Sequence, residues 1–251
     1  MQDHPNPPTL AIRGLVVRRG ARTTIDGLDL SVAAGSVYAL LGGNGAGKTT
    51  TLDVLLGFVP PAAGDVRVDG LSPASDGAAV RARLAYLPEN VALYPYLNGI
   101  ENLQYFCALA DIRVSEPGAH DLLHRVGLQA ASHGARTGTY SKGMRQKVGL
   151  AIAHAKHAKA MLLDEPTSGL DPAAANDFAQ RIRAAAQAGM AVLMATHDLF
   201  NARQVADRIG ILRAGRLVAE FDAHAVTHDA LESVYLAHAR ETHESAAGEA
   251  A

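Results

Sequence analysis

The sequence of 251 residues has no tryptophan, one cysteine (Cys107) and an aromatic content of only 5%. A single cysteine excludes an internal disulfide and fits a reducing cytosol. No apolar run approaches the roughly 18 residues that span a bilayer, and the first eight residues lack the basic and apolar parts of a secretory signal. A formal net charge of −2 argues against a nucleic-acid-binding surface. We therefore expect a cytoplasmic protein that binds no nucleic acid and reaches any membrane through a partner.

Hydrophobic residues make up 48% of the chain, enough to bury a sizeable core. Strand-like composition occurs at residues 10–18 and 28–32, with a turn region over 20–26, and again at 66–70 and 84–87. The first part of the chain is therefore expected to be rich in short strands.

Helical spacing of apolar residues begins at residue 99 and continues to residue 128, where Pro117 and Gly118 are expected to separate at least two helices. Another helix is expected to start near Ser141, a plausible N-cap. Apolar runs without alternation, which suit strands buried in a parallel sheet, occupy residues 160–163 and 191–195.

An alanine-rich helix is expected between these runs, over residues 173–188, and a last helix over 229–240. Residues 241–251 are small, polar and acidic, and we expect them to be disordered.

Residues 42–49 read Gly-Gly-Asn-Gly-Ala-Gly-Lys-Thr and match G-x-x-x-x-G-K-[ST], a loop that wraps nucleotide phosphates. An apolar, strand-like run precedes the loop and a helical segment follows it, which is the context the motif requires. Glycines let successive N–H groups point at the phosphates, and the helix start adds its positive end. Lys48 is expected to reach the β- and γ-phosphates, and the Thr49 hydroxyl to bind Mg²⁺. The predicted nucleotide-binding residues here are Gly42, Gly43, Asn44, Gly45, Ala46, Gly47, Lys48, Thr49 and Thr50.

Two acidic residues, Asp164 and Glu165, follow the apolar run at 160–163. Such a pair commonly marks a strand-to-loop boundary, but downstream of a phosphate loop it suits magnesium-dependent hydrolysis. Asp164 is expected to hold Mg²⁺ together with Thr49, and Glu165 to polarise the attacking water.

Three further segments carry a family resemblance: YSKGMRQ at 140–146, SGLD at 168–171 and THD at 196–198. They resemble the signature, the D-loop and the switch histidine of ATP-binding-cassette (ABC) ATPases, in the order typical of that family. The resemblance covers about residues 10–222. YLPEN at 86–90 is most similar to exporters of drugs, polysaccharides and sodium, and to the ATPase of nitrous-oxide reductase maturation.

The resemblance implies an α/β fold: a P-loop NTPase (RecA-like) parallel sheet core with an N-terminal antiparallel β subdomain and an inserted helical subdomain. It divides the chain into residues 1–89 (core, first part), 90–145 (helical signature subdomain), 146–222 (core, second part) and 223–251 (short helix and acidic tail).

The resemblance also implies an ATPase that works as a homodimer or heterodimer, with two ATP molecules sandwiched between subunits. A separate integral-membrane permease is expected to dock over the helical insert and residues 89–96, which places the chain peripherally on the inner face of the cell membrane. Export is expected rather than import, because no regulatory domain follows the cassette.

Site residues follow from the same resemblance. Glu165 and His197 are the implied catalytic pair, and Asp171 belongs to the D-loop. The signature residues, which would contact ATP bound to the other subunit, are Ser141, Lys142, Gly143 and Met144.

The sequence departs from the family at several positions, of which Arg19 and Glu89 bear on the site. Arg19 stands where relatives carry an aromatic residue that stacks on adenine; its guanidinium can stack on a base, or it is a solvated surface arginine. Glu89 stands where a glutamine usually contacts Mg²⁺; its carboxylate could bind the metal, and both roles stay open.

Other interpretations are a non-transport ABC ATPase acting on ribosomes or DNA, and a P-loop kinase or GTPase. The single cassette, the short insert and the net charge disfavour the first, and the second needs neither signature nor histidine. His120/His124 and His224/His228 have the i,i+4 spacing of a metal site, but solvated helix faces are favoured because no further ligand completes either pair.

Overall fold

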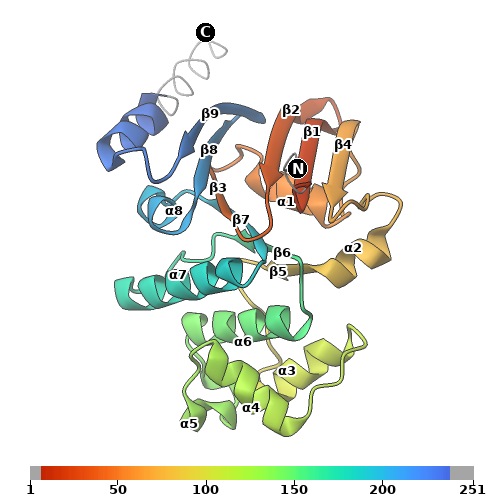
Figure 1. Ribbon diagram of the computed structural model, residues 1–251, viewed down its shortest axis with the longest axis vertical. Coiled ribbons are helices and arrows are strands. Elements are labelled where there is room, and N and C mark those ends of the chain that lie inside the picture. The colour runs from red at the N-terminus through yellow and green to blue at the C-terminus, as the bar shows by residue number, and fades with distance from the viewer. Residues whose placement is uncertain (1–6, 238–251) are drawn as a thin grey trace, which may run out of the picture.

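The computed structural model describes residues 7–237 and contains two β-sheets and a group of helices below them (Figure 1). The larger sheet has six strands, all parallel except the edge strand, which pairs antiparallel with its neighbour. Its strands are, in spatial order, β5 (Leu84–Leu87), β6 (Ala160–Asp164), β7 (Ala191–Thr196), β3 (Val37–Leu41), β8 (Arg208–Arg213) and β9 (Arg216–Asp222). The expected strands at 84–87, 160–163 and 191–195 are confirmed, and so is the parallel core.

Both faces of this sheet are buried at its central strands, as their uninterrupted apolar sequences predict, whereas the residues of the edge strand β9 are exposed or partly exposed. Alternate residues of each strand point to opposite faces. In β3, for example, Tyr38 and Leu40 join the cluster under the smaller sheet, whereas Val37, Ala39 and Leu41 join the cluster under the helices. The carboxyl ends of β3, β6 and β7 therefore emerge at one edge of a rigid, dry layer.

The smaller sheet is antiparallel and has the order β2 (Arg22–Val32), β1 (Leu10–Arg19) and β4 (Ala63–Val68). The expected turn over residues 20–26 is wrong, because β2 already begins at Arg22 and only residues 20 and 21 form the turn. The β-branched residues Thr23 and Ile25 pair with β1 and extend the strand.

The helices occupy three places. Helix α1 (Lys48–Leu55) packs between the sheets, and α7 (Pro172–Gln187) and α8 (Leu199–Val205) cover the opposite face of the large sheet (Figure 1). The remaining elements, most of them in the lower part of Figure 1, are α2 (Gly77–Arg83), α3 (Gly99–Ala108), α4 (Glu116–Arg125), α5 (Ala130–His133), the short 3₁₀ helix η1 (Thr137–Thr139) and α6 (Lys142–Ala155).

Two helices do fill residues 99–128, but the expected break at Pro117 and Gly118 is wrong. Both residues lie in the first turn of α4, and the chain leaves helical geometry over residues 109–115 instead. Proline fits the first turn because its missing N–H would have no intrahelical partner there. Ser141 caps α6 as expected, and accepts a hydrogen bond from the Met144 backbone N–H.

Helix α6 crosses the expected boundary at residue 145 and packs on α3 and α4 on one side and on β5 and α7 on the other. We keep the four-part division of the chain as a proposal. A last helix occupies residues 228–237; the rest of the expected helix, and the tail over 241–251, lie outside the described residues. None of the helices between residues 7 and 237 has the length and apolar character needed to span a membrane.

Candidate active site

The loop over residues 42–49 connects β3 to α1 and is tightly enclosed by the rest of the core. Gly47 has φ 113°, and a Cβ added there would lie 2.5 Å from Ile25 Cδ1. A Cβ at Gly42 would lie 2.6 Å from the carbonyl oxygen of Leu212. Gly45 also has a left-handed φ, of 77°. Glycine is therefore required at Gly42 and Gly47 by packing and at Gly45 and Gly47 by backbone conformation.

Lys48 is the first residue of α1, and its side chain is only 7% exposed. Its Nζ donates to the carbonyl oxygen of Gly42 at 2.6 Å and lies 3.2 Å from Glu165 Oε1. The ammonium group is thus held between the loop and the end of β6, where it can pair with an anion. No side chain caps the start of α1, so its first N–H groups also face the loop.

Thr49 and Asp164 meet at the ends of α1 and β6. The Thr49 hydroxyl donates to Asp164 Oδ2 at 3.1 Å. Burial raises the pKa of Asp164, and the Thr49 hydrogen bond and the nearby Lys48 oppose this only in part. A hydroxyl and a carboxylate together are hard oxygen donors, which fits a magnesium ion.

Glu165 follows directly in a left-handed backbone conformation, with φ 45°. Its Oε2 accepts from the Thr196 hydroxyl at 3.1 Å and from the backbone N–H of His197 at 3.2 Å, and lies 2.9 Å from His197 Nδ1. Burial acts to raise the pKa of Glu165, but hydrogen bonds from His197 and the charge of Lys48 outweigh it, so the pKa is lowered. The carboxylate is therefore held ionised and oriented.

His197 lies at the end of β7, and its ring is 58% exposed. Because the Glu165 carboxylate accepts from Nδ1, the neutral ring carries its proton there and leaves Nε2 as an acceptor at the open side. The structure thus brings together five of the predicted residues: Lys48, Thr49, Asp164, Glu165 and His197.

The signature and D-loop residues form a second group. Ser141 is exposed at the start of α6, followed by partly exposed Lys142, Gly143 and Met144. Asp171 caps α7 by accepting from the Ala174 N–H at 2.9 Å. Within the described part of the chain, residues 141–144 form no hydrogen bond or ion pair with the phosphate loop. Their predicted contact with a nucleotide on another subunit stays a prediction.

Glu89 links the signature to the D-loop segment: its Oε1 accepts from the Ser168 hydroxyl at 3.0 Å and lies 3.7 Å from Lys142 Nζ. Its negative charge also acts to raise the pKa of Asp164, which places it near the predicted metal site. Contact of Glu89 with Mg²⁺ stays a prediction.

Arg19 is 57% exposed and forms an ion pair with Asp53 of α1, with NH2 and Oδ2 3.3 Å apart. The pair holds the guanidinium near the phosphate-loop helix, so stacking on a base and a surface role both stay open.

Sequence analysis gave no role to three polar residues of this region, although two of them stand in the THD and YLPEN segments: Thr196, which bonds Glu165; Asp53, which bonds Arg19; and Tyr86 of β5. Burial raises the pKa of Tyr86 to about 12, with smaller contributions from the charges of Asp164 and Asp53. Thr196 could have been found from its place directly before His197, whereas Asp53 gives no signal because it lies on a helix like any surface acid.

Two of the histidines at i,i+4 spacing have a near neighbour elsewhere in the chain. His120 places Nδ1 2.9 Å from Nδ1 of the buried His133, and His224 Nε2 lies 3.6 Å from Asp207. Within the described part of the chain, no three histidine, cysteine or acidic side chains are grouped as metal ligands. All four histidines are exposed, in agreement with the preference for solvated positions, although His224 lies in a turn before the last helix and not on a helix face.

A strand–loop–helix with a buried lysine, beside an acidic strand end, defines a P-loop nucleotide hydrolase. Comparison with known proteins narrows the class. A family profile described as ABC transporter matches residues 25–168. The chain belongs to the ABC transporter ATP-binding family and is an ATP-hydrolysing subunit of such a system.

Individual relatives agree. The daunorubicin resistance ATP-binding protein DrrA3 of Streptomyces coeruleorubidus is 39% identical over 84% of this chain and 67% of its own length. The Nod factor export ATP-binding protein I of Ralstonia nicotianae is 35% identical over 88% of this chain and 70% of its own. A solved structure of an ATP-binding subunit of an ABC transporter superposes with a TM-score of 0.74 at 30% identity, covering 85% of this chain and 90% of that one.

Proposed function

We propose that the chain is the ATPase of an exporter, and that binding and hydrolysis of ATP close and open a pair of such subunits to drive a separate membrane permease. The observation that carries the proposal is the meeting of Lys48, Thr49, Asp164, Glu165 and His197 at the carboxyl ends of β3, β6 and β7. In parallel sheets this edge is where ligands bind.

Each of these residues has a chemical task. Lys48 and the N–H groups of the loop bind the triphosphate. Thr49 and Asp164, with Glu89 as a further candidate, would hold Mg²⁺, which neutralises charge on the β- and γ-phosphates when bound. Glu165 is ionised and fixed by three hydrogen bonds, so it can accept a proton from the attacking water. His197 orients Glu165 through Nδ1, and because phosphate oxygens only accept hydrogen bonds, contact with the γ-phosphate requires a proton on Nε2 as well.

The second half of each ATP site comes from another subunit, of the same or of a different kind. Ser141 and the first turn of α6 are exposed, and a helix start favours a bound phosphate. Asp171 at the start of α7 lies in the adjoining D-loop. We infer that the γ-phosphate joins the two subunits and that its release lets them separate.

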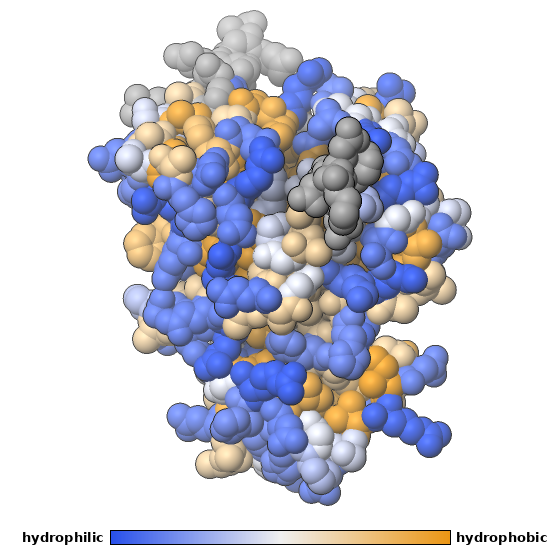
Figure 2. Space-filling model, in the orientation of Figure 1, coloured by the Kyte–Doolittle hydropathy of each residue, from blue (hydrophilic) through white to orange (hydrophobic). Residues whose placement is uncertain are grey.

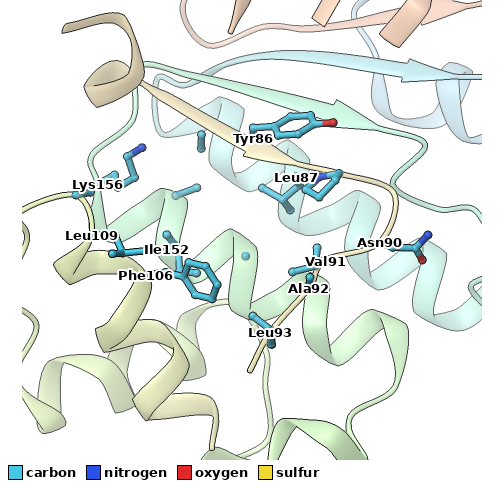
Figure 3. A pocket seen from close by; sticks show the side chains of 15 residues that line it. Tyr86, Leu87, Asn90, Val91, Ala92, Leu93, Phe106, Leu109, Ile152 and Lys156 are labelled. Carbon is cyan, nitrogen blue, oxygen red and sulfur yellow. The ribbon is translucent and has the colours of Figure 1, made fainter. Parts of the chain in front are cut away.

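A groove between the large sheet and the helical part supports the permease contact. Its volume is about 440 Å³, and its walls are β5 with the residues that follow it, the end of α3 and one face of α6 (Figure 3). Phe106, Leu109 and Ile152 line it, and Leu109 is 67% exposed. Figure 2 shows hydrophobic residues gathered at its lower right, on the helical part of the molecule. We propose that an apolar helix of the permease occupies this groove, which would hold the subunit at the inner face of the membrane.

Export is proposed because several relatives carry export or resistance in their names, among them the Nod factor export protein. The permease would select the cargo.

Glu165→Gln tests the hydrolysis mechanism. The variant keeps a polar side chain but cannot accept a proton, so turnover should fall by about 10²- to 10⁴-fold. ATP should then hold it as a dimer in light scattering after gel filtration, whereas the exposed Glu232→Gln control should behave as wild type. A Glu165→Gln variant that still hydrolyses ATP, or that stays monomeric with ATP, would overturn the proposal.

Leu109→Asp tests the groove. The side chain is mostly exposed, so the variant should fold, but a carboxylate would oppose an apolar partner. The membrane-bound fraction in cells that produce the permease should drop, while Leu236→Asp, exposed on the last helix, should leave it unchanged. Equal membrane binding of both variants would exclude this docking site.

A further inference from the structure

A second cavity, of about 360 Å³, lies at the far end of α6 from the signature. Its walls are the chain before α4, one face of α4 along its length and the end of α6, including Arg113, Ser115, Arg125, His154 and His157. None of these residues belongs to the nucleotide site or to the groove proposed for the permease.

All the titratable side chains in its walls are basic, and no aspartate or glutamate lines it. Several arginines elsewhere in the described chain are paired with a carboxylate, as Arg181 is with Asp177 and Arg183 with Asp207. Within residues 7–237, by contrast, neither Arg113 nor Arg125 has a carboxylate at salt-bridge distance. The cavity therefore gathers positive charge that the described chain does not neutralise.

The basic side chains of the cavity are close enough to change the pKa of His154. Burial lowers the pKa of His154, and the charges of Arg125 and then His157 lower it further. No acid opposes them among the groups that set this pKa. Like charges held together from α4 and α6 repel, and an anion between them would remove that repulsion.

The donors in the cavity suit tetrahedral oxyanions. A guanidinium group presents a fork of N–H donors that matches two phosphate oxygens. Ser115 Oγ accepts the Gly118 N–H at 3.2 Å, so the hydroxyl hydrogen is left to donate into the cavity. We propose that this cavity binds a phosphate-bearing anion through Arg113, Arg125, Ser115 and His154.

Two sources could supply this group. Helix α6 lines both this cavity, through His154, and the apolar groove, through Ile152, so the headgroup of an acidic phospholipid is one source. Free phosphate or a soluble phosphorylated compound is the other.

The test is an NMR titration of the full chain saturated with ADP, to which inorganic phosphate is added. The imidazole resonances of His154 are followed, and they are assigned by their loss in His154→Gln. Phosphate should shift these resonances and raise the pKa of His154. Arg113→Gln with Arg125→Gln should weaken this binding at least about tenfold. Arg136→Gln, an exposed arginine of the helical part outside the cavity, should leave it unchanged.

Sedimentation with vesicles identifies the source. If phosphatidylglycerol in phosphatidylcholine retains the wild type but not the double variant, the anion is a lipid headgroup; if phosphate binds and vesicles do not distinguish the two proteins, it is a soluble compound. Unchanged His154 resonances at about 20 mM phosphate, well above a millimolar dissociation constant, would overturn the proposal. So would shifts that are the same in the double variant.

Discussion

The phosphate loop and the signature segment each place glycine beside the start of a helix, α1 and α6, but the surroundings of the two glycines differ. At Gly47 an added Cβ would lie 2.5 Å from Ile25 Cδ1, and the φ of 113° is left-handed. At Gly143 an added Cβ would meet only Leu170 and Ala174, at 3.7 and 3.8 Å, which is ordinary contact. Lys48 is buried beside Gly47, whereas Ser141 is exposed.

The difference shows which part of the site the chain completes by itself. Packing within the subunit already requires the glycine of the phosphate loop. Nothing within the described residues requires glycine at position 143, so a requirement there would come from a molecule that approaches the start of α6. This asymmetry is what a site shared between two subunits should leave in each one.

Lysine substitutions should show the largest difference between the two segments, in ATP affinity. Lys48→Ala removes a buried ammonium group at the phosphate loop and should weaken ATP binding about 10- to 100-fold, the value of a charged hydrogen bond. Lys142→Ala should leave the ATP affinity of the isolated subunit unchanged. Isothermal titration calorimetry measures both, and equal losses would contradict the asymmetry.

Substituting alanine for each glycine compares the two segments by their effect on the free energy of unfolding. Gly47→Ala should cost about 1–3 kcal/mol of unfolding free energy through backbone strain, with a further cost from the contact with Ile25. Gly143→Ala should stay within about 0.5 kcal/mol of wild type. Urea unfolding gives both values; a strongly destabilised Gly143→Ala protein would show that packing within the subunit also fixes the signature.

Two serine caps separate a role in helix capping from a role at the nucleotide site. Ser115 and Ser141 each accept the N–H three residues on, at 3.2 and 3.3 Å. Alanine at either position should cost about 1 kcal/mol of stability. Only Ser141→Ala should also reduce ATP turnover per folded subunit, and a matching loss in Ser115→Ala would remove the special role of Ser141.

The neighbouring carboxylates Asp164 and Glu165 should have small and opposite effects on stability near neutral pH. The pKa of Glu165 is below its ordinary value of 4.5, so its ionised form stabilises the fold above that pH and the gain is lost as pH falls through the lowered pKa. The pKa of Asp164 is above 3.8, so its ionised form costs stability near neutral pH. Thermal melting at pH 7 should rank Asp164→Asn at or above wild type and Glu165→Gln below it; the reverse order would contradict these shifts.

Local patterns predicted the parts of the fold that neighbouring residues determine. The phosphate loop, the buried strands and the Ser141 cap all follow from short segments read in order. The turn over 20–26 and the break at Pro117 failed for a local reason too, because β-branched residues extend a strand and proline starts a helix as readily as it ends one.

Contacts between distant segments could not be predicted in this way. Arg19 and Asp53 are 34 positions apart, and Glu89 and Ser168 are 79 apart. His120 was weighed against His124 on its own helix, but tertiary packing turned it toward His133 instead.

Helix α6 has 14 residues and is therefore about 21 Å long. It has the signature at one end, the groove proposed for the permease along its side and the basic cavity at the other end. If a partner bound in the groove tilts this helix, Ser141 must move as well. A nucleotide bound at Ser141 would in turn oppose that tilt.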